Sequence, residues 1–248
     1  PVNSVDVSFE AAKGIGYIKV SKFARNTYNE FITAIAKLKQ AGCTSFVIDL
    51  RGNTGGYMDA AINMINEFMP EGRLIVYTEG KSFPRSDVYA NGTGTCKDAP
   101  IVVLTDEISA SASEIFSGAI QDNDRGTIIG RRTYGKGLVQ TQMSLSDGSE
   151  MRLTIARYYT PSGRCIQKKY EMGNTDAYDQ DIYNRYMHGE FDSADSIKMD
   201  DSLKYQTVGG RTVYGGGGIM PDIFIPRDTS GVTSYYSNVV NSGVLYLY

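Results

Sequence analysis

Three serines alternate with alanines in the stretch DEISASASEIFSGAIQD, from Asp106 to Asp122. A serine hydroxyl becomes a nucleophile when a neighbouring base removes its proton. Ser111 and Glu114 have the spacing of a capping box at the start of a helix. Ser111 is therefore either a helix cap or a nucleophile at a helix start, where the helix dipole stabilises developing negative charge. In the second case the N–H of Ala112 points to where an oxyanion would form.

A serine nucleophile needs a base, and the chain contains a single histidine, His188. It lies in the polar stretch NRYMHGEF, which is typical of a surface segment. Lys136 is the other candidate, because it stands between two glycines in RTYGKGLVQ (132–140) and another backbone can approach such a site closely. In an extended segment Gln140 lies on the same face and could orient the amine. The alternative is an exposed turn lysine.

A glycine-rich loop, RGNTGG (51–56), follows a short apolar run. Gly55 and Gly56 permit backbone conformations that are closed to other residues. An exposed N–H in this loop, together with that of Ala112, would make a two-donor oxyanion hole. A tight turn without chemistry is the alternative. The loop has neither the glycine spacing of dinucleotide-binding loops nor the lysine of a phosphate-binding loop.

Composition excludes several classes of protein. The chain has 248 residues and a net charge of -3, which argues against a nucleic-acid or anionic-membrane surface. No apolar run approaches the roughly 18 residues that span a bilayer. Cys43, Cys96 and Cys165 lack the spacing of metal ligands. We read them as ordinary thiols, with one disulfide and a spare thiol left open, and we expect no metal site and no cofactor.

The elements that must position these residues alternate between strand and helix. The patterns predict strands at 14–23, 44–50, 73–80, 99–106 and 126–133, and helices at 26–42, at 60–69 and after Ser111. Thr27 and Glu30 predict a capping box for the first helix. The alternation indicates right-handed βαβ units and a mostly parallel sheet in an α/β fold. Since sites in such sheets form beyond the carboxyl ends of strands, RGNTGG and ISASASE are expected on one edge.

The second half of the chain reads differently. Segments 137–145 and 150–159 flank SDGS, whose Asp-Gly pair predicts a β-hairpin. From 168 to 218 the sequence is polar and rich in tyrosine, which indicates an insertion or lid with short helices packed by aromatic rings. The stretch 215–226 ends in a predicted strand. We expect a single catalytic domain over 1–248.

Five blocks in this order resemble the C-terminal processing (tail-specific) peptidases: VIDLRGNTGG, ISASASEIFSGAIQDNDRG, GRRTYGKGLVQ, DGSEMRLTIARYYTPSGR and GGIMPDI. The resemblance runs from about Gly16 to Pro226. It implies a serine peptidase with a Clp-protease/crotonase-like core. It also implies that Ser111 is the nucleophile, that Lys136 is its general base, and that Gln140 orients the lysine. His188 is then a bystander, and we expect the Ser111 and Lys136 side chains within about 3.2 Å.

The same resemblance implies an oxyanion hole formed by the amide of Gly55 or Gly56 and that of Ala112. Thr54 stands where the family often has proline. Family members usually carry a PDZ domain that recruits substrate C-termini; none is recognised here, so we expect one upstream in a longer parent chain. The implied partners are polypeptides with unstructured C-termini, and the implied location is extracytoplasmic, in a bacterial periplasm or cell envelope.

Two other functions fit parts of the sequence. A crotonase-like acyl-CoA enzyme shares a two-amide oxyanion hole but does not need the Ser/Lys pair. An inactive peptide-binding module could keep the scaffold without the chemistry. The presence of Ser111, Lys136 and Gln140 together favours the peptidase over both.

Overall fold

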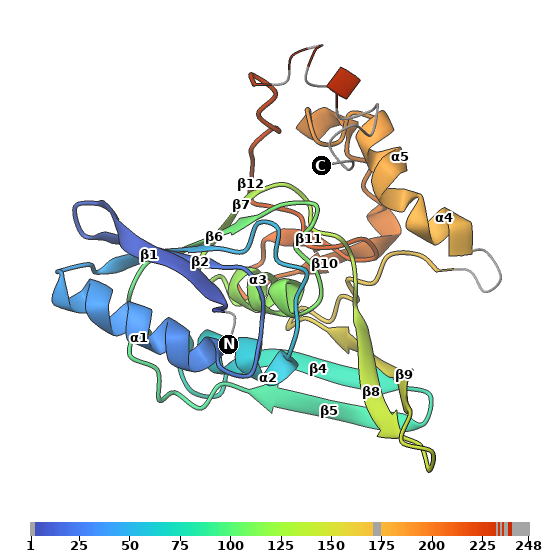
Figure 1. The fold of residues 1–248 in the computed structure, drawn as a ribbon, viewed down its shortest axis with the longest axis horizontal. Helices are drawn as coiled ribbons and strands as arrows, with labels where there is room; N and C mark the ends of the chain where they lie inside the picture. Colours follow the sequence, from blue (N-terminus) through green and yellow to red (C-terminus); the bar gives the residue numbers. More distant parts are fainter. Residues whose placement is uncertain (1–2, 171–174, 232, 234, 236–237, 240–248) are drawn as a thin grey trace.

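The computed structural model describes residues 3–170, 175–231, 233, 235 and 238–239. The helices and strands are, in chain order, β1 (Val5–Ala12), β2 (Ile15–Val20), α1 (Thr27–Gln40), β3 (Ser45–Asp49), α2 (Met58–Asn66), β4 (Leu74–Gly80), β5 (Phe83–Tyr89), β6 (Ile101–Thr105), α3 (Ala112–Asp122), β7 (Thr127–Gly130), β8 (Leu138–Ser144), β9 (Glu150–Tyr159), α4 (Thr175–Asp179), α5 (Asp181–Met187), β10 (Lys204–Gln206), β11 (Thr212–Tyr214) and β12 (Ile223–Phe224). Figure 1 shows their arrangement.

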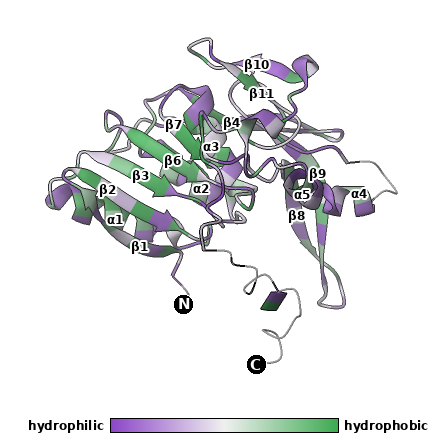
Figure 2. Cartoon of the chain, turned by 90° about the horizontal axis from the view of Figure 1, so that it is seen from above, coloured by the Kyte–Doolittle hydropathy of each residue, from purple (hydrophilic) through white to green (hydrophobic). Residues whose placement is uncertain are grey.

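The larger sheet has the strand order β1-β2-β3-β6-β7-β12. Parallel pairing joins β2 to β3, β3 to β6, β6 to β7 and β7 to β12. The edge strand β1 pairs antiparallel, with β2. Figure 2 shows hydrophobic residues concentrated on the central strands β3 and β6, as expected for strands that are covered on both faces. The prediction of a mostly parallel sheet in an α/β fold is confirmed.

The second sheet is antiparallel, in the order β5-β4-β9-β8, and contains the predicted hairpin β8–β9. The predicted strand at 73–80 is β4, but it belongs to this sheet: Tyr77 pairs with Tyr159 of β9. The sequence predicted this strand but not the sheet to which it belongs, because strand pairing over this distance leaves no local pattern. The sequence analysis also missed β1 and β5. Strand β1 (VDVSFEAA) does alternate between apolar and polar residues and was overlooked, whereas β5 (FPRSDVY) is exposed along most of its length and carries no alternation.

Helix α1 begins at Thr27, but the capping box predicted for Thr27 and Glu30 does not form. Glu30 Oε2 instead accepts the N–H groups of Ser4 (2.8 Å) and Val5 (3.0 Å). The Thr27 hydroxyl accepts the N–H of Ala24 at 2.7 Å. Glu30 therefore fastens the N-terminal segment to the helix, whereas Thr27 makes a local contact in the turn before it. In a capping box Glu30 would accept an amide at the start of its own helix. Here it accepts the distant amides of Ser4 and Val5 instead.

Helix α3 lies at the centre of the molecule, between β7 of the large sheet and β4 of the antiparallel sheet (Figure 1). Every one of its residues is buried. Phe116 of α3 makes an edge-to-face contact with Phe68, with ring centroids 6.5 Å apart. The helix that starts at Ser111 is therefore anchored along its whole length in the core.

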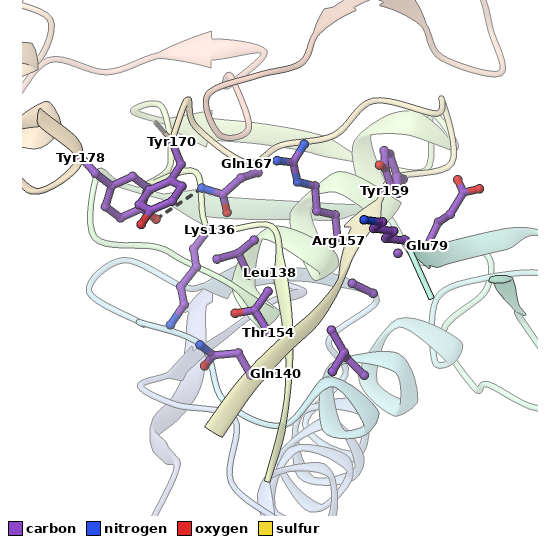
Figure 3. A pocket seen from close by; sticks show the side chains of 14 residues that line it. Glu79, Lys136, Leu138, Gln140, Thr154, Arg157, Tyr159, Gln167, Tyr170 and Tyr178 are labelled. Carbon is purple, nitrogen blue, oxygen red and sulfur yellow. Dashed lines mark hydrogen bonds between the residues drawn. The ribbon is translucent and has the colours of Figure 1, made fainter. Parts of the chain in front are cut away.

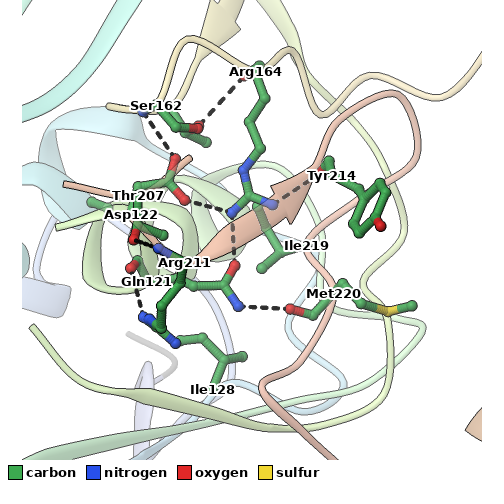
Figure 4. A network of polar contacts seen from close by, with 12 residues as sticks. Gln121, Asp122, Ile128, Ser162, Arg164, Thr207, Arg211, Tyr214, Ile219 and Met220 are labelled. Carbon is green, nitrogen blue, oxygen red and sulfur yellow. Dashed lines mark hydrogen bonds and ion pairs between the residues drawn. The ribbon is translucent and has the colours of Figure 1, made fainter. Parts of the chain in front are cut away.

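The insertion at 168–218 contains α4, α5, β10 and β11, and its last strand is tied to α3 by Arg164 (Figure 4). The Arg164 and Asp122 side chains are both fully buried and lie 2.6 Å apart. The Arg164 guanidinium also donates to Gln121 Oε1 at 2.7 Å and to the carbonyl of Tyr214 at 2.9 Å. Removing one partner of such a buried pair is strongly destabilising.

The three cysteines carry free thiols; Cys43 and Cys96 are buried and Cys165 is half-buried. Burial raises the pKa of each thiol. Within the described part of the chain, no helix has both the length and the apolar character that crossing a membrane requires.

Candidate active site

Ser111 occupies the turn between β6 and α3, with φ 55° and ψ -114°. A positive φ in a residue with a side chain is strained and persists only where the surroundings enforce it. The Ser111 N–H donates to Glu114 Oε2 at 2.8 Å, as the capping box predicts. The N–H of Glu114 donates to the backbone oxygen of Ser111 at 2.8 Å. Both halves of the capping box are present, so the Ser111 side chain also faces the N–H of Glu114.

The two neighbouring serines have structural contacts. The Ser109 hydroxyl is buried and donates to the carbonyl of Leu50 at 2.8 Å. The Ser113 hydroxyl is also buried and donates to the carbonyl of Asn53 at 2.9 Å. Both fasten the start of α3 to the end of β3 and its loop. Ser111 is thus the serine of this stretch whose side chain lines a cavity.

Gly55 approaches the nucleophile closely, with φ 100°. A Cβ at this position would lie 2.7 Å from the Ser111 Cβ and 2.9 Å from the Ala112 nitrogen, so only glycine fits. The Gly55 N–H, however, donates to Asn53 Oδ1 at 2.8 Å. The sequence analysis offered Gly55 and Gly56 as alternative oxyanion donors, and in this structure the Gly55 amide already has a protein acceptor.

Gly56 forms a parallel bridge with Phe23. The bridge uses the Gly55 carbonyl (3.0 Å to the Phe23 nitrogen) and the Tyr57 N–H (2.8 Å to the Phe23 oxygen). In this pairing the N–H of Gly56 itself points away from Phe23. Among the described residues neither this N–H nor that of Ala112 donates to a protein acceptor, and both residues line the cavity of Ser111. Gly56 and Ala112 therefore each present a backbone donor without a protein acceptor among the described residues.

Glu114 connects the Ser111 turn to the loop that carries Lys136. Its fully buried carboxylate accepts the N–H groups of Ser111 (2.8 Å), Gly135 (2.7 Å) and Lys136 (2.8 Å), and the hydroxyl of Thr133 (2.5 Å). Burial raises the pKa of Glu114, and the four donors act in the opposite direction. The sequence analysis recognised the bond to Ser111 and missed the other three, which depend on the fold.

Residues of the second half of the chain hold the same loop from its other side. Gln167 Oε1 accepts the N–H of Gly137 at 2.9 Å. The buried Arg185 guanidinium of α5 donates to the carbonyls of Thr133 (2.9 Å) and Arg132 (2.8 Å). No sequence motif pointed to these contacts, because an arginine in a polar, tyrosine-rich stretch looks like a surface residue.

A cavity of about 560 Å³ brings the predicted site together: Ser111, Ala112, Gly56, Lys136 and Gln140 all line it. Lys136 is half-buried, and among the described residues its ammonium forms no ion pair. No hydrogen bond joins the Ser111 and Lys136 side chains within the part of the chain that the structure describes, so the expected contact at about 3.2 Å is not formed. In Figure 3 the Lys136 side chain extends towards Gln140.

A second cavity, of about 920 Å³, shares Lys136, Leu138 and Gln140 with the first. Tyr170 and Tyr178, which belong to the insertion, form part of its wall (Figure 3). The insertion therefore contributes to the surface next to the candidate base. His188, by contrast, is exposed at the end of α5 and lines neither cavity.

The structure thus places Ser111 and Lys136 at one cavity, and comparison with known proteins gives the family. The model of peptidase family S41 matches residues 14–176, and the chain belongs to this family. It is 41% identical over 156 residues to a carboxyl-terminal-processing protease of Synechocystis sp., covering 63% of this chain and 36% of that protein. It is 38% identical over 159 residues to the chloroplastic C-terminal processing peptidase of Tetradesmus obliquus, covering 64% and 34%.

Among solved structures, the chain is similar to a photosystem II D1 C-terminal processing protease, with a TM-score of 0.61 and 27% identity. The alignment covers 90% of this chain and 46% of that one. The matched part spans about a third of the length of the two curated relatives.

Proposed function

We propose that this chain is the catalytic part of a serine endopeptidase that hydrolyses peptide bonds near the C-terminal tails of unstructured or misfolded proteins. One observation carries the proposal. Ser111, Lys136 and two backbone amides without protein acceptors line a single cavity, although they come from three separate segments. Membership of family S41 and relatives named C-terminal processing proteases support it.

In the proposed reaction the Ser111 Oγ attacks the carbonyl carbon of the scissile bond while the Lys136 Nζ accepts its proton. The N–H groups of Gly56 and Ala112 donate to the oxyanion of the tetrahedral intermediate. Lys136 then gives the proton to the leaving amine, which departs with the C-terminal fragment. A water molecule, deprotonated by Lys136, releases the acyl group from Ser111.

Gln140 is proposed to orient the Lys136 amine towards Ser111. It stands at the start of β8 and lines both cavities with Lys136. A break in the pairing register lies between Val139 and Gln140, and irregularities of this kind re-aim side chains next to active sites. Hydrogen bonds between catalytic groups are often long before substrate binds, so the open Ser111–Lys136 pair is compatible with this role.

We further propose that the parent protein acts outside the cytoplasm and recruits substrates through a PDZ domain. Both follow from the resemblance to tail-specific peptidases. A tethered recruiting domain raises the local concentration of a tail to the mM range for a short flexible connection. Attaching such a domain to this chain should then lower KM for long substrates and leave kcat nearly unchanged.

The test uses an unfolded reporter protein with an apolar C-terminus, incubated with wild type, Ser111→Ala and Lys136→Ala, and read by mass spectrometry. Each variant should lose at least about 10³-fold in turnover while keeping its fold. His188→Ala is the control and should keep wild-type turnover. Continued cleavage by Ser111→Ala would exclude the serine mechanism. A wild-type chain that binds the reporter but never cuts it would favour the peptide-binding module.

A further inference from the structure

Tyr158 of β9 contacts the backbone of both proposed catalytic residues. Its side chain is 2% exposed and belongs to the hydrophobic core. Its phenol oxygen lies 3.0 Å from the carbonyl oxygen of Ser111 and also donates to the carbonyl of Lys136. The N–H of Tyr158 donates to the carbonyl of Gly137 at 3.0 Å, so the same residue also holds the next peptide unit of the lysine loop.

We propose that Tyr158 is a positioning residue that sets the distance between the nucleophile Ser111 and the base Lys136. The proposal rests on the roles assigned above to these two residues. The phenol acts through their backbones and takes no part in proton transfer. Because one rigid ring spans both carbonyls, a movement of either segment away from the other must break one of the two contacts.

The environment suits a permanent donor. Burial raises the pKa of Tyr158 well above its ordinary value, and the nearby Glu114 carboxylate acts in the same direction, so the hydroxyl keeps its proton. A phenolic proton can be shared between two acceptors in a three-centre hydrogen bond. Both acceptors are fixed backbone oxygens, which makes the contact a geometric constraint.

The two carbonyls depend on Tyr158 to different degrees. The Ser111 oxygen also accepts the N–H groups of Glu114 (2.8 Å) and Ile115 (3.0 Å). The Lys136 oxygen accepts no other hydrogen bond among the residues that the structure describes. Loss of the hydroxyl therefore leaves the Ser111 carbonyl with two donors and the Lys136 carbonyl with none, so that Lys136 shifts more than Ser111 although its N–H stays bound to Glu114.

The direct test is Tyr158→Phe, which keeps the ring and removes the donor. We expect kcat to fall about 10- to 100-fold, since a small displacement of a catalytic group costs that much. KM should stay within about twofold, because contacts with bound substrate are retained. Labelling of Ser111 by a fluorophosphonate, which needs the same base, should slow by the same factor as kcat.

Tyr28→Phe is the matched control. Its phenol donates to Glu67 Oε1 at 2.7 Å, and neither residue lines either cavity, so the variant loses a comparable hydrogen bond away from the candidate site. It should lower the melting temperature without changing kcat. A similar loss of kcat in both variants would mean that destabilisation alone explains the effect, and would overturn the proposal.

Rescue supplies the second arm. p-Aminophenylalanine at position 158 has two N–H donors on the same ring and should restore kcat. If the Tyr158→Phe variant does not fold, the amino variant alone tests the proposal. A folded amino variant as slow as Tyr158→Phe, or wild-type kcat in Tyr158→Phe, would refute the positioning role. Failure of the proposed function has a different signature, namely turnover that survives in Ser111→Ala.

Discussion

The turn that carries Ser111 and the loop that carries Lys136 are held in different ways. The Ser111 turn is fastened to the large sheet: the N–H of Ala110 (3.0 Å) and the hydroxyl of Ser113 (2.9 Å) both donate to the carbonyl of Asn53. Asn53 lies in the loop that follows β3, a central strand of the large sheet. Ser111 is therefore held through contacts with the loop of a core strand.

The Lys136 loop relies on residues that follow it in the chain. The backbone N–H of Lys168 donates to the carbonyl of Gly135 at 2.9 Å. The Lys168 ammonium is buried, 4.1 Å from the ring centroids of both Tyr134 in the loop and Tyr178 in α4. Such cation–π contacts are strongest when desolvated. The Lys136 loop is thus braced by the tyrosine-rich insertion, and changes in the insertion are expected to disturb this half of the candidate site.

Among changes to the residues that hold the two regions, Glu114→Gln should cause the largest loss of turnover and stability. It weakens the carboxylate contacts that link the Ser111 turn to the Lys136 loop. A neutral amide cannot accept four hydrogen bonds and brings two unwanted donors into a buried site. We expect a loss of at least about 100-fold in kcat, because both catalytic segments shift. The free energy of unfolding should fall by about 2–5 kcal/mol. Denaturant titration and turnover on the reporter measure the two effects.

Glu107→Gln is the matched control for this change. Glu107 pairs with Arg131 at 2.6 Å near the surface, outside both cavities. Pairs of this kind contribute about 0–1 kcal/mol. Equal losses in the two variants would show that charge, rather than the bridge between the two segments, accounts for the effect.

An intermediate loss of turnover is expected for Arg185→Ala. This change removes one contact of the insertion with the Lys136 loop and leaves the Ser111 turn untouched. The carbonyls of Thr133 and Arg132 lose their donors. We expect kcat to fall about tenfold. Amide hydrogen exchange should accelerate at 133–137 and stay unchanged at 110–116.

Lys204→Ala serves as the control from the same insertion, since its pair with Asp201 is exposed. It should change neither exchange nor turnover. Acceleration at 110–116 in Arg185→Ala would contradict the comparison, because it would mean that the two regions loosen together.

The smallest effect should come from Ser113→Ala, on the nucleophile side. The Asn53 carbonyl keeps the donor N–H of Ala110, so no buried acceptor is left without a partner. The free energy of unfolding should fall by only about 0.5–1.5 kcal/mol. Turnover should stay within the same order of magnitude, as a thermal melt and the reporter assay can establish. A collapse of activity would mean that the Ser111 turn is less well supported than its contacts indicate.

Much of the fold was accessible from local patterns. Continuous apolar runs gave β3 and β6, helical spacing gave α1 and α3, and Asp-Gly gave the hairpin β8–β9. The exposed strand β5 carried no such pattern, and the alternation of β1 was overlooked. The partner of β4 was also out of reach, because an isolated strand sequence does not state which strand it will pair with.

The sequence by itself determined the chemical groups of the site and their immediate surroundings: a serine at a helix start with Glu114 in capping position, and a lysine between glycines. Such features depend on backbone conformation within a few residues. Only the tertiary structure decided that Gly56 rather than Gly55 keeps a free N–H, and that Glu114 also holds Lys136, which lies 22 residues further along the chain. Contacts over that distance follow from the path of the whole chain, because each donor must find an acceptor among whatever residues the packed core brings beside it.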